Sequence, residues 1–195
     1  QHEFKSMPAK DVTLIKKQTA LGPQSFTKGN SKTKVGAATG VLGQTCSGHK
    51  YAIVIGISDY PGVGSDLMYG DDDAWTMADV LIKVYRFSHA NVTVLADSNA
   101  TAQNILDAIN RLRDKVKANN EIVFFFSGHG GIGIADDGDN EKWDESIVCW
   151  GDNENFAYIW DGQLKDWFSG FATSRIVFIF DSCYAGGMID LAGPG

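Results

Sequence analysis

Three uninterrupted apolar runs constrain the fold of this chain more than any other feature. They cover Tyr51–Ile57, Ile122–Phe126 and Ile176–Phe180, and each has the length of a strand. A strand that is apolar at every position is buried on both faces, which is typical of the centre of a parallel sheet. Such a sheet needs helices on both sides to cover it.

Segments with other periodicities fill the chain between these runs. Apolar residues at helical spacing predict a helix over Asp71–Phe87 and a second helix that begins at the N-cap Thr101. Shorter strands are predicted at Val92–Leu95 and Ile147–Trp150, and a third helix near Asp161–Phe168. Because strands and helices alternate, we expect an α/β fold with a mainly parallel sheet and helices on both faces, a three-layer sandwich.

The charge of the chain divides it into two parts. Residues 1–50 hold eight lysines against two acidic residues, a net charge of +6, whereas residues 51–195 hold nine Lys and Arg against 22 Asp and Glu, a net charge of −13. Residues 1–49 are also rich in Thr, Gly and Ser, with one short strand predicted at Val12–Ile15. We therefore expect a basic N-terminal arm over 1–49, a propeptide, and a folded catalytic region over 50–195.

Composition excludes several classes of function. A total net charge of −7 argues against nucleic-acid binding, and no apolar run approaches the ~20 residues that a membrane span needs. The three cysteines form no CxxC pair, so a structural zinc site is not expected. Three cysteines fit a reducing or an oxidising compartment equally well, which leaves a cytoplasmic and a secreted location open.

Two chemically reactive side chains follow two of the apolar runs. His129 lies in the segment Ser127–Gly131, and Cys183 lies in the segment Asp181–Gly187. The carboxyl ends of parallel strands meet at one edge of a sheet, so we expect the two side chains to be neighbours. An imidazole beside a thiol lets the sulfur react as a thiolate and then protonates the leaving amine. Backbone amides of a glycine-rich turn can hold the oxyanion that forms in between.

These segments resemble those of the caspase-like cysteine proteases, and of metacaspases in particular. The resemblance runs from about Lys50 to Asp190, and it also includes Leu67–Gly70, Asp72–Ala74 and Trp143–Ile147. Several motifs in the same order and at the same spacing make the resemblance specific for the superfamily.

The resemblance implies a role for three of these residues. His129 would be the catalytic histidine, Cys183 the nucleophile, and Gly130 would form the oxyanion hole together with the Cys183 amide. The residues after Cys183 are Tyr184 and Ala185, where metacaspases usually have histidine and serine. Because of this departure, the branch of the superfamily stays open, and a prokaryotic relative of the metacaspases is an alternative.

A preference for basic substrates follows from the same comparison and from charge. Asp73 and Asp181 match the aspartates that line the specificity pocket of metacaspases and select arginine or lysine before the scissile bond. A pocket with two carboxylates and no cation rejects acidic side chains. The arginines with which caspases read aspartate are scarce here, and we expect them away from the cleft; they are Arg86, Arg111, Arg113 and Arg175.

Calcium is the cofactor that the resemblance implies, and no organic cofactor is expected. The acidic segment Asp136–Glu145 lacks the spacing of an EF-hand. The matches to the metacaspase calcium ligands are Asp144, Asp161 and Asp190, while Gly162 replaces a further aspartate that is common in the family. We therefore expect calcium activation.

The resemblance also implies a partner segment. A caspase-type domain continues past its nucleophile into further strands, whereas this sequence ends twelve residues after Cys183. We expect a large-subunit portion that needs a small-subunit segment of the same precursor, activated by autoprocessing. Lysines of the basic arm are candidate self-ligands of an acidic pocket; they are Lys16, Lys17, Lys28, Lys32 and Lys34.

Two other functions are alternatives to proteolysis. A caspase-like scaffold without proteolysis would use the same cleft for binding only. A flavodoxin-like signalling domain would use the acidic cluster Asp71–Asp73 to hold a divalent cation. With Cys183 assigned as nucleophile, the remaining Cys46 and Cys149 form a candidate disulfide, which would favour secretion.

Overall fold

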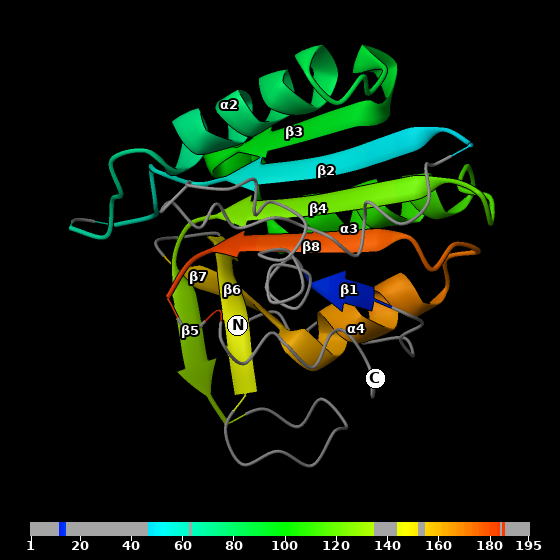
Figure 1. Ribbon diagram of the computed structural model, residues 1–195. Helices are drawn as coiled ribbons and strands as arrows, with labels where there is room; N and C mark the ends of the chain where they lie inside the picture. The colour runs from blue at the N-terminus through cyan, green and yellow to red at the C-terminus, as the bar shows by residue number, and fades with distance from the viewer. Residues whose placement is uncertain are drawn as a thin grey trace, which may run out of the picture.

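Two sheets organise the chain in the computed structural model, which describes residues 12–14, 47–62, 64–134, 144–151, 155–183 and 185. The larger sheet is parallel and has the strand order β1-β8-β4-β2-β3, and the smaller sheet is antiparallel with the order β5-β6-β7 (Figure 1). The strands of the larger sheet are β1 (Val12–Leu14), β2 (Lys50–Gly56), β3 (Val92–Ala96), β4 (Glu121–Ser127) and β8 (Ile176–Asp181).

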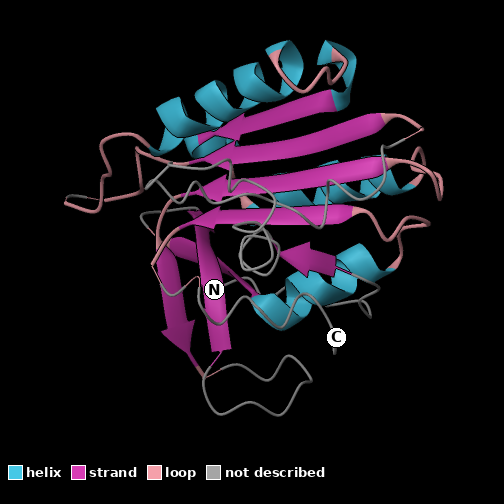
Figure 2. Ribbon diagram, viewed as in Figure 1, coloured by secondary structure: helices cyan, strands magenta, loops and turns pink. Residues whose placement is uncertain are grey.

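Within the residues that the structure describes, three α-helices cover the parallel sheet. They are α2 (Gly70–Lys83), α3 (Ala102–Arg113) and α4 (Asp161–Ser169), and two short 3₁₀ turns, η3 (His89–Asn91) and η4 (Asp97–Asn99), flank β3. Figure 2 shows α2 on one side of the sheet and α3 and α4 on the other. This is the three-layer α/β arrangement that the alternation of strands and helices predicts, and the prediction is confirmed.

The apolar runs are buried because their side chains alternate between two cores. Ile53 and Ile55 of β2 belong to the core under α3 and α4, whereas Ala52 and Val54 belong to the core under α2. All four side chains are at most 1% exposed. A strand that feeds two cores has no polar face, which is the reason that these runs are apolar at every position.

The first helix ends earlier than its periodicity predicts, at Lys83 rather than at Phe87. Arg86 adopts a left-handed backbone conformation with φ of 63°, and the Phe87 amide donates back to the Leu81 carbonyl at 3.0 Å. The Phe87 amide thus satisfies a carbonyl of the last helical turn from beyond the end of the helix. Phe87 is therefore buried against the sheet from outside the helix.

The smaller sheet was only partly expected from the sequence. It consists of β5 (Gly130–Gly133), β6 (Asp144–Trp150) and β7 (Phe156–Trp160), and only β6 overlaps a predicted strand. The sheet lies at the lower left in Figure 1, beside the end of the parallel sheet to which the arrows point. β4 runs into β5 through Gly128 and His129, so the smaller sheet begins directly beside the predicted catalytic histidine.

The strand predicted at Val12–Ile15 is confirmed as β1, which pairs in parallel with β8. Its register sets Val12 level with Ile176 and Leu14 level with Phe178. The edge of β8 that faces away from β4 is therefore covered by a strand from the basic arm. The other residues of the arm, up to Cys46, lie outside the described residues.

The expected disulfide is wrong. Cys149 is a fully buried free thiol, and Cys46 lies outside the described residues. Burial raises the pKa of the Cys149 thiol, so the side chain stays neutral and packs as a small apolar group. Without this disulfide, the cysteines no longer favour secretion. Among the described helices, none has the length and apolar character that crossing a membrane requires.

Candidate catalytic site

The turns after β4 and β8 begin side by side. Ser127, the last residue of β4, is the register partner of Asp181, the last residue of β8, and the Gly128 amide donates to the Asp181 carbonyl at 3.2 Å. His129 and Cys183 each follow two residues later. Both turns therefore leave the same edge of the sheet at the same level, as the matching strand ends predict (Figure 1).

The backbone just after His129 touches the backbone of Cys183. A Cβ atom added at Gly130 would lie 1.9 Å from the Cys183 carbonyl oxygen. Only glycine permits so close an approach of two chain segments. The structure thus brings together His129, Gly130 and Cys183, the three residues predicted for catalysis, with Cys183 exposed and His129 partly buried.

The His129 imidazole is oriented by a carbonyl group that sequence reasoning missed. Its Nε2 atom lies 2.7 Å from the carbonyl oxygen of Ser65. A carbonyl oxygen only accepts hydrogen bonds, so Nε2 carries a proton and Nδ1 is the nitrogen that can take a proton from a thiol. The loop that delivers Ser65 turns at Gly62 and Gly64, whose φ angles are 95° and 90°.

Tyr60 is a second contact of His129 that the sequence did not reveal. The two rings lie with centroids 4.7 Å apart, and the Tyr60 hydroxyl oxygen accepts a hydrogen bond from the His129 amide at 2.8 Å. The tyrosine is 2% exposed. Tyr60 lies in the first loop after β2, 69 residues before His129, so the sequence does not predict this contact.

The two aspartates predicted for specificity flank Ser127. The Ser127 hydroxyl donates to Oδ2 of Asp73 at 3.1 Å, and Asp181 is the register partner of Ser127 on the neighbouring strand. Asp73 is half-buried in the first turn of α2, and Asp181 is exposed. The structure therefore gathers both carboxylates at the edge that carries His129 and Cys183.

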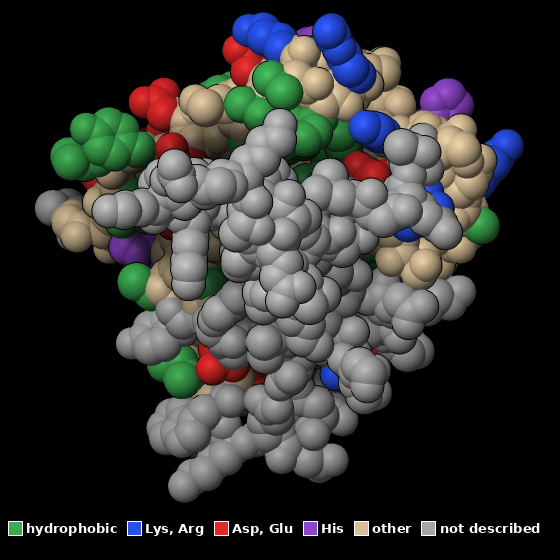
Figure 3. Space-filling view, in the orientation of Figure 1, with side chains coloured by type: hydrophobic (Ala, Val, Ile, Leu, Met, Phe, Trp, Pro, Cys, Tyr) green, Lys and Arg blue, Asp and Glu red, His purple; other side chains and the backbone are tan. Residues whose placement is uncertain are grey.

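All four arginines lie towards the opposite edge of the sheet. Arg175 directly precedes β8, and Arg86 follows the end of α2, while Arg111 and Arg113 occupy the last turn of α3. Helices that start at the carboxyl ends of parallel strands return to the amino ends. On the face shown in Figure 3, the visible blue side chains gather mainly at the top and right, whereas red ones stand at the upper left.

Two of the three predicted calcium ligands are buried at neighbouring strand ends of the smaller sheet. Asp144 starts β6 and Asp161 directly follows β7, and the ladder pairs Ser146 with Trp160. The carboxylates are 0% and 2% exposed, and the Oδ1 atom of each has no hydrogen-bond partner in the described structure, although both residues make other contacts. Asp190 lies outside the described residues, and the described part contains no cluster of three metal-ligating side chains.

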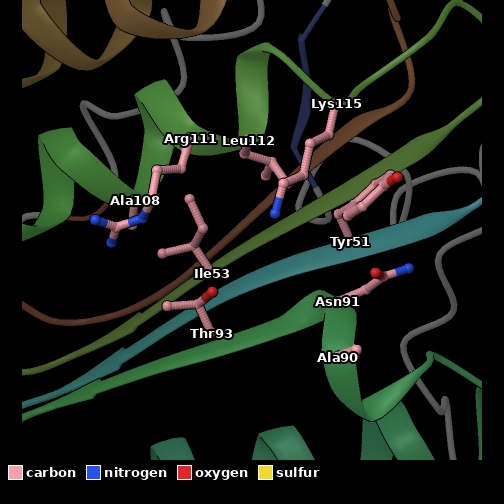
Figure 4. A pocket seen from close by; sticks show the side chains of 9 residues that line it. All are labelled: Tyr51, Ile53, Ala90, Asn91, Thr93, Ala108, Arg111, Leu112 and Lys115. Atoms are coloured by element: carbon pink, nitrogen blue, oxygen red, sulfur yellow. The ribbon is translucent and has the colours of Figure 1, made fainter.

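A shallow hollow of about 70 Å³ lies at the other end of the parallel sheet (Figure 4). Its floor is formed by Tyr51 and Ile53 of β2 and Thr93 of β3, and Arg111 and Lys115 stand at its rim. Because these residues lie at the starts of the strands, the hollow is separate from the site at the strands' carboxyl ends.

Comparison with known proteins agrees with this geometry. Residues 50–192 match the metacaspase peptidase C14 domain. Metacaspase-1 of Schizosaccharomyces pombe is 31% identical over 156 residues, which cover 75% of this chain and 36% of that protein. Metacaspase-4 of Arabidopsis thaliana is 33% identical over 152 residues, which cover 73% of this chain and 35% of that protein. The chain thus spans about a third of the length of these curated relatives.

A crystal structure of a Geobacter sulfurreducens protein has a similar fold, with a TM-score of 0.59 at 22% identity, over 70% of this chain and 51% of that chain. This similarity concerns the fold alone. The domain match covers most of the sequence and includes both turns that meet at the edge of the sheet. The chain therefore belongs to the metacaspase family of peptidases.

Proposed function

We propose that this chain is the catalytic part of a cysteine endopeptidase that cuts after arginine or lysine, with Cys183 as nucleophile and His129 as its acid–base partner. The observation that carries the proposal is the contact between the two turns, in which Gly130 lies against the Cys183 carbonyl. A histidine whose imidazole is oriented by the Ser65 carbonyl lies one residue from that contact.

The chemistry requires two proton transfers in each half of the reaction. The Cys183 thiol passes its proton to Nδ1 of His129, and the sulfur attacks the scissile carbonyl carbon. Amides of Gly130 and Cys183 stabilise the resulting oxyanion. The C–N bond then breaks, and His129 returns the proton to the leaving amine, which leaves a thioester. Water deprotonated by His129 attacks the thioester and releases the acid and the thiol.

Charge at the carboxyl edge supports the basic specificity. Asp73 and Asp181 stand on either side of Ser127, and the four arginines lie towards the far edge. An arginine or lysine side chain from the substrate gains from both carboxylates, while an aspartate would be repelled. The Asp73 carboxylate already accepts from Ser127, which fixes its position before substrate arrives.

Calcium fits the pair formed by Asp144 and Asp161. Two buried carboxylates at neighbouring strand ends offer the hard oxygen ligands that calcium prefers. In this proposal Asp144, Asp161 and Asp190 would hold the ion, which would neutralise the charge of these carboxylates. Asp161 is also the first residue of α4, where the helix dipole stabilises its charge.

The basic arm is proposed to act as a propeptide that occupies the acidic site. β1 runs parallel to β8, and the chain direction at Leu14 therefore leads towards the edge with Asp181. Lys16 and Lys17 follow Leu14 by two and three residues in the sequence. Replacing both lysines by alanine is expected to raise the initial rate on short peptides. An unchanged initial rate would contradict the inhibitory role.

The test of the proposed function is hydrolysis of matched fluorogenic peptides that end in Arg, Lys or Asp, by the full-length protein with and without calcium. We expect cleavage of the Arg and Lys peptides, stimulation by calcium, and no activity in the Cys183→Ala variant. Cleavage of the Asp peptide alone would overturn the specificity, and activity in Cys183→Ala would overturn the mechanism. A small-subunit segment of the same precursor is the proposed partner for full turnover.

A further inference from the structure

The hydrogen bonding between His129 and Val148 is unusual for an antiparallel pair. The ladder of β5 and β6 sets Gly130 opposite Ile147, so His129 and Val148 form the next position. The Val148 amide donates directly to the His129 carbonyl at 2.9 Å. The reciprocal bond is replaced by a bridge, because the His129 amide donates to the Tyr60 hydroxyl at 2.8 Å and that hydroxyl donates to the Val148 carbonyl at 3.0 Å.

The Tyr60 oxygen therefore acts as a spacer in the ladder. In a regular pair the two residues exchange both backbone hydrogen bonds directly. Here the bond from the Val148 amide to the His129 carbonyl is direct. The bond from the His129 amide to the Val148 carbonyl is replaced by two hydrogen bonds through the Tyr60 hydroxyl. The His129 amide therefore reaches β6 only through the Tyr60 hydroxyl, at the residue that carries the imidazole.

The spacer is itself held firmly. Tyr60 is 2% exposed, its amide donates to the Asp66 carboxylate at 3.1 Å, and its ring lies 5.9 Å from the ring of Phe156. A Cβ atom at Gly128 would lie 2.5 Å from the Tyr60 hydroxyl, so the glycine before His129 leaves the room that the hydroxyl needs. Burial raises the pKa of Tyr60, and the hydroxyl stays protonated and remains a donor to Val148.

We propose that Tyr60 is a positioning residue for the catalytic histidine: its hydroxyl sets the backbone of His129 relative to β6, and its ring packs against the imidazole. The proposal rests on the proposed function, in which the imidazole exchanges a proton with Cys183. Tyr60 contacts no reacting atom in this scheme and acts only through His129.

Removing the hydroxyl has a defined consequence. In Tyr60→Phe the His129 amide and the Val148 carbonyl lose the hydroxyl that joins them. Val148 is buried and His129 is partly buried. The pair then closes into a direct bond or remains unpaired, and in either case the imidazole moves relative to Cys183. Because a displacement of about 1 Å can cost about 100-fold in rate, we expect kcat to fall by about 10- to 100-fold with KM changed less than about threefold.

The experiment compares Tyr60→Phe with the matched control Tyr51→Phe. Tyr51 is also a buried tyrosine of the same core, but it lies at the amino end of β2, away from the site. Steady-state kinetics gives kcat and KM, and nitrogen-15 NMR gives the shifts of the His129 amide and imidazole. We expect both readouts to change in Tyr60→Phe and neither to change in Tyr51→Phe.

The outcomes separate this proposal from the proposed function. Wild-type kcat and unchanged His129 shifts in Tyr60→Phe would overturn the positioning role. If the wild type hydrolyses no peptide, the proposed function fails, and the NMR shifts still decide whether Tyr60 positions His129. If Tyr60→Phe does not fold, the wild type decides: a His129 amide protected from exchange and close to a Tyr60 hydroxyl proton supports the proposal, and a rapidly exchanging amide contradicts it.

Discussion

The two halves of the site are built differently, although they follow strands of the same kind. The turn after β4 is held by the Ser65 carbonyl, by Tyr60 and by β6, all of which contact His129. The turn after β8 presents Cys183 exposed, and Ser182 before it has a buried hydroxyl that forms no hydrogen bond within the described structure. The histidine is therefore oriented by its surroundings, while the proposed nucleophile is exposed.

In the proposed function, activity therefore depends on the two turns in unequal ways. Around His129, residues that never touch substrate determine where the imidazole lies. At Cys183, the proposed catalysis depends on the exposed thiol and on the contact of the Cys183 carbonyl with Gly130. Substitutions of the residues that support His129 are thus expected to reduce activity, whereas the turn that carries Cys183 has fewer such residues.

Cys183→Ala is the most severe change for catalysis and the mildest for stability. It removes the proposed nucleophile, and we expect kcat to fall by at least about 10³-fold, as in enzymes that lose a triad member. Because the side chain is exposed, we expect the free energy of unfolding to stay within about 0.5 kcal/mol. Kinetics and urea denaturation measure the two quantities. A destabilised variant would show that Cys183 has a structural role, which would contradict the difference between the two turns.

Gly130→Ala tests the contact between the halves. The added Cβ would meet the Cys183 carbonyl at 1.9 Å, so the two turns must separate. We expect a loss of about 100-fold in kcat/KM, the effect of a displacement of about 1 Å in the catalytic groups. Ile132→Ala on the same strand, where the side chain is 45% exposed, is the control and should retain activity. Equal activity of both variants would show that the turns are not coupled.

Asp73→Asn and Asp181→Asn test the charge that both halves share. Each variant removes one carboxylate and keeps the size of the side chain. For peptides that end in arginine we expect kcat/KM to fall by about 10- to 100-fold, which corresponds to about 1.4 to 2.7 kcal/mol. Peptides that end in a neutral residue serve as the internal control and should be cleaved at rates close to those of the wild type. A uniform loss on all peptides would assign the aspartates to structure instead.

Cys149→Ala is expected to leave activity unchanged, in contrast to Cys183→Ala. Burial raises the pKa of Cys149 above its ordinary value of 9.0, so the folded protein keeps this proton while the unfolded chain loses it. This contribution to stability is complete below about pH 9 and decreases as the pH rises further. Urea denaturation between pH 8 and 11 should therefore show a shallower loss of stability in Cys149→Ala than in the wild type. Parallel curves would contradict the assignment.

The sequence predicted the larger sheet well because burial on two faces leaves a strong signal. Runs such as Ile122–Phe126 have no polar position, and their length and flanking turns identify them as strands. β5 was missed because three of its four residues are glycine, which weakens a strand, and Gly130 is there for its approach to Cys183. Strand propensity fails at β5 because the contact with Cys183, which is distant in the sequence, requires glycine at position 130.

For the site, the sequence pointed to the residues that are proposed to carry the chemistry and missed those that contact His129. His129 and Cys183 stand at strand ends with glycines beside them, a pattern visible in the sequence. Tyr60 and Ser65 act through a hydroxyl and a main-chain carbonyl, and they lie 69 and 64 residues from His129. A main-chain carbonyl has no sequence signature, and a lone tyrosine in a loop has none that distinguishes it from core packing.

The most direct test of the central claim is covalent capture by an arginyl acyloxymethyl ketone, with the modified residue and the rate determined by mass spectrometry. We expect labelling at Cys183 alone, at least about tenfold faster than with the aspartyl analogue and strongly slowed in His129→Ala. Labelling of Cys149, equal rates with both reagents, or a rate that does not depend on His129 would contradict the account.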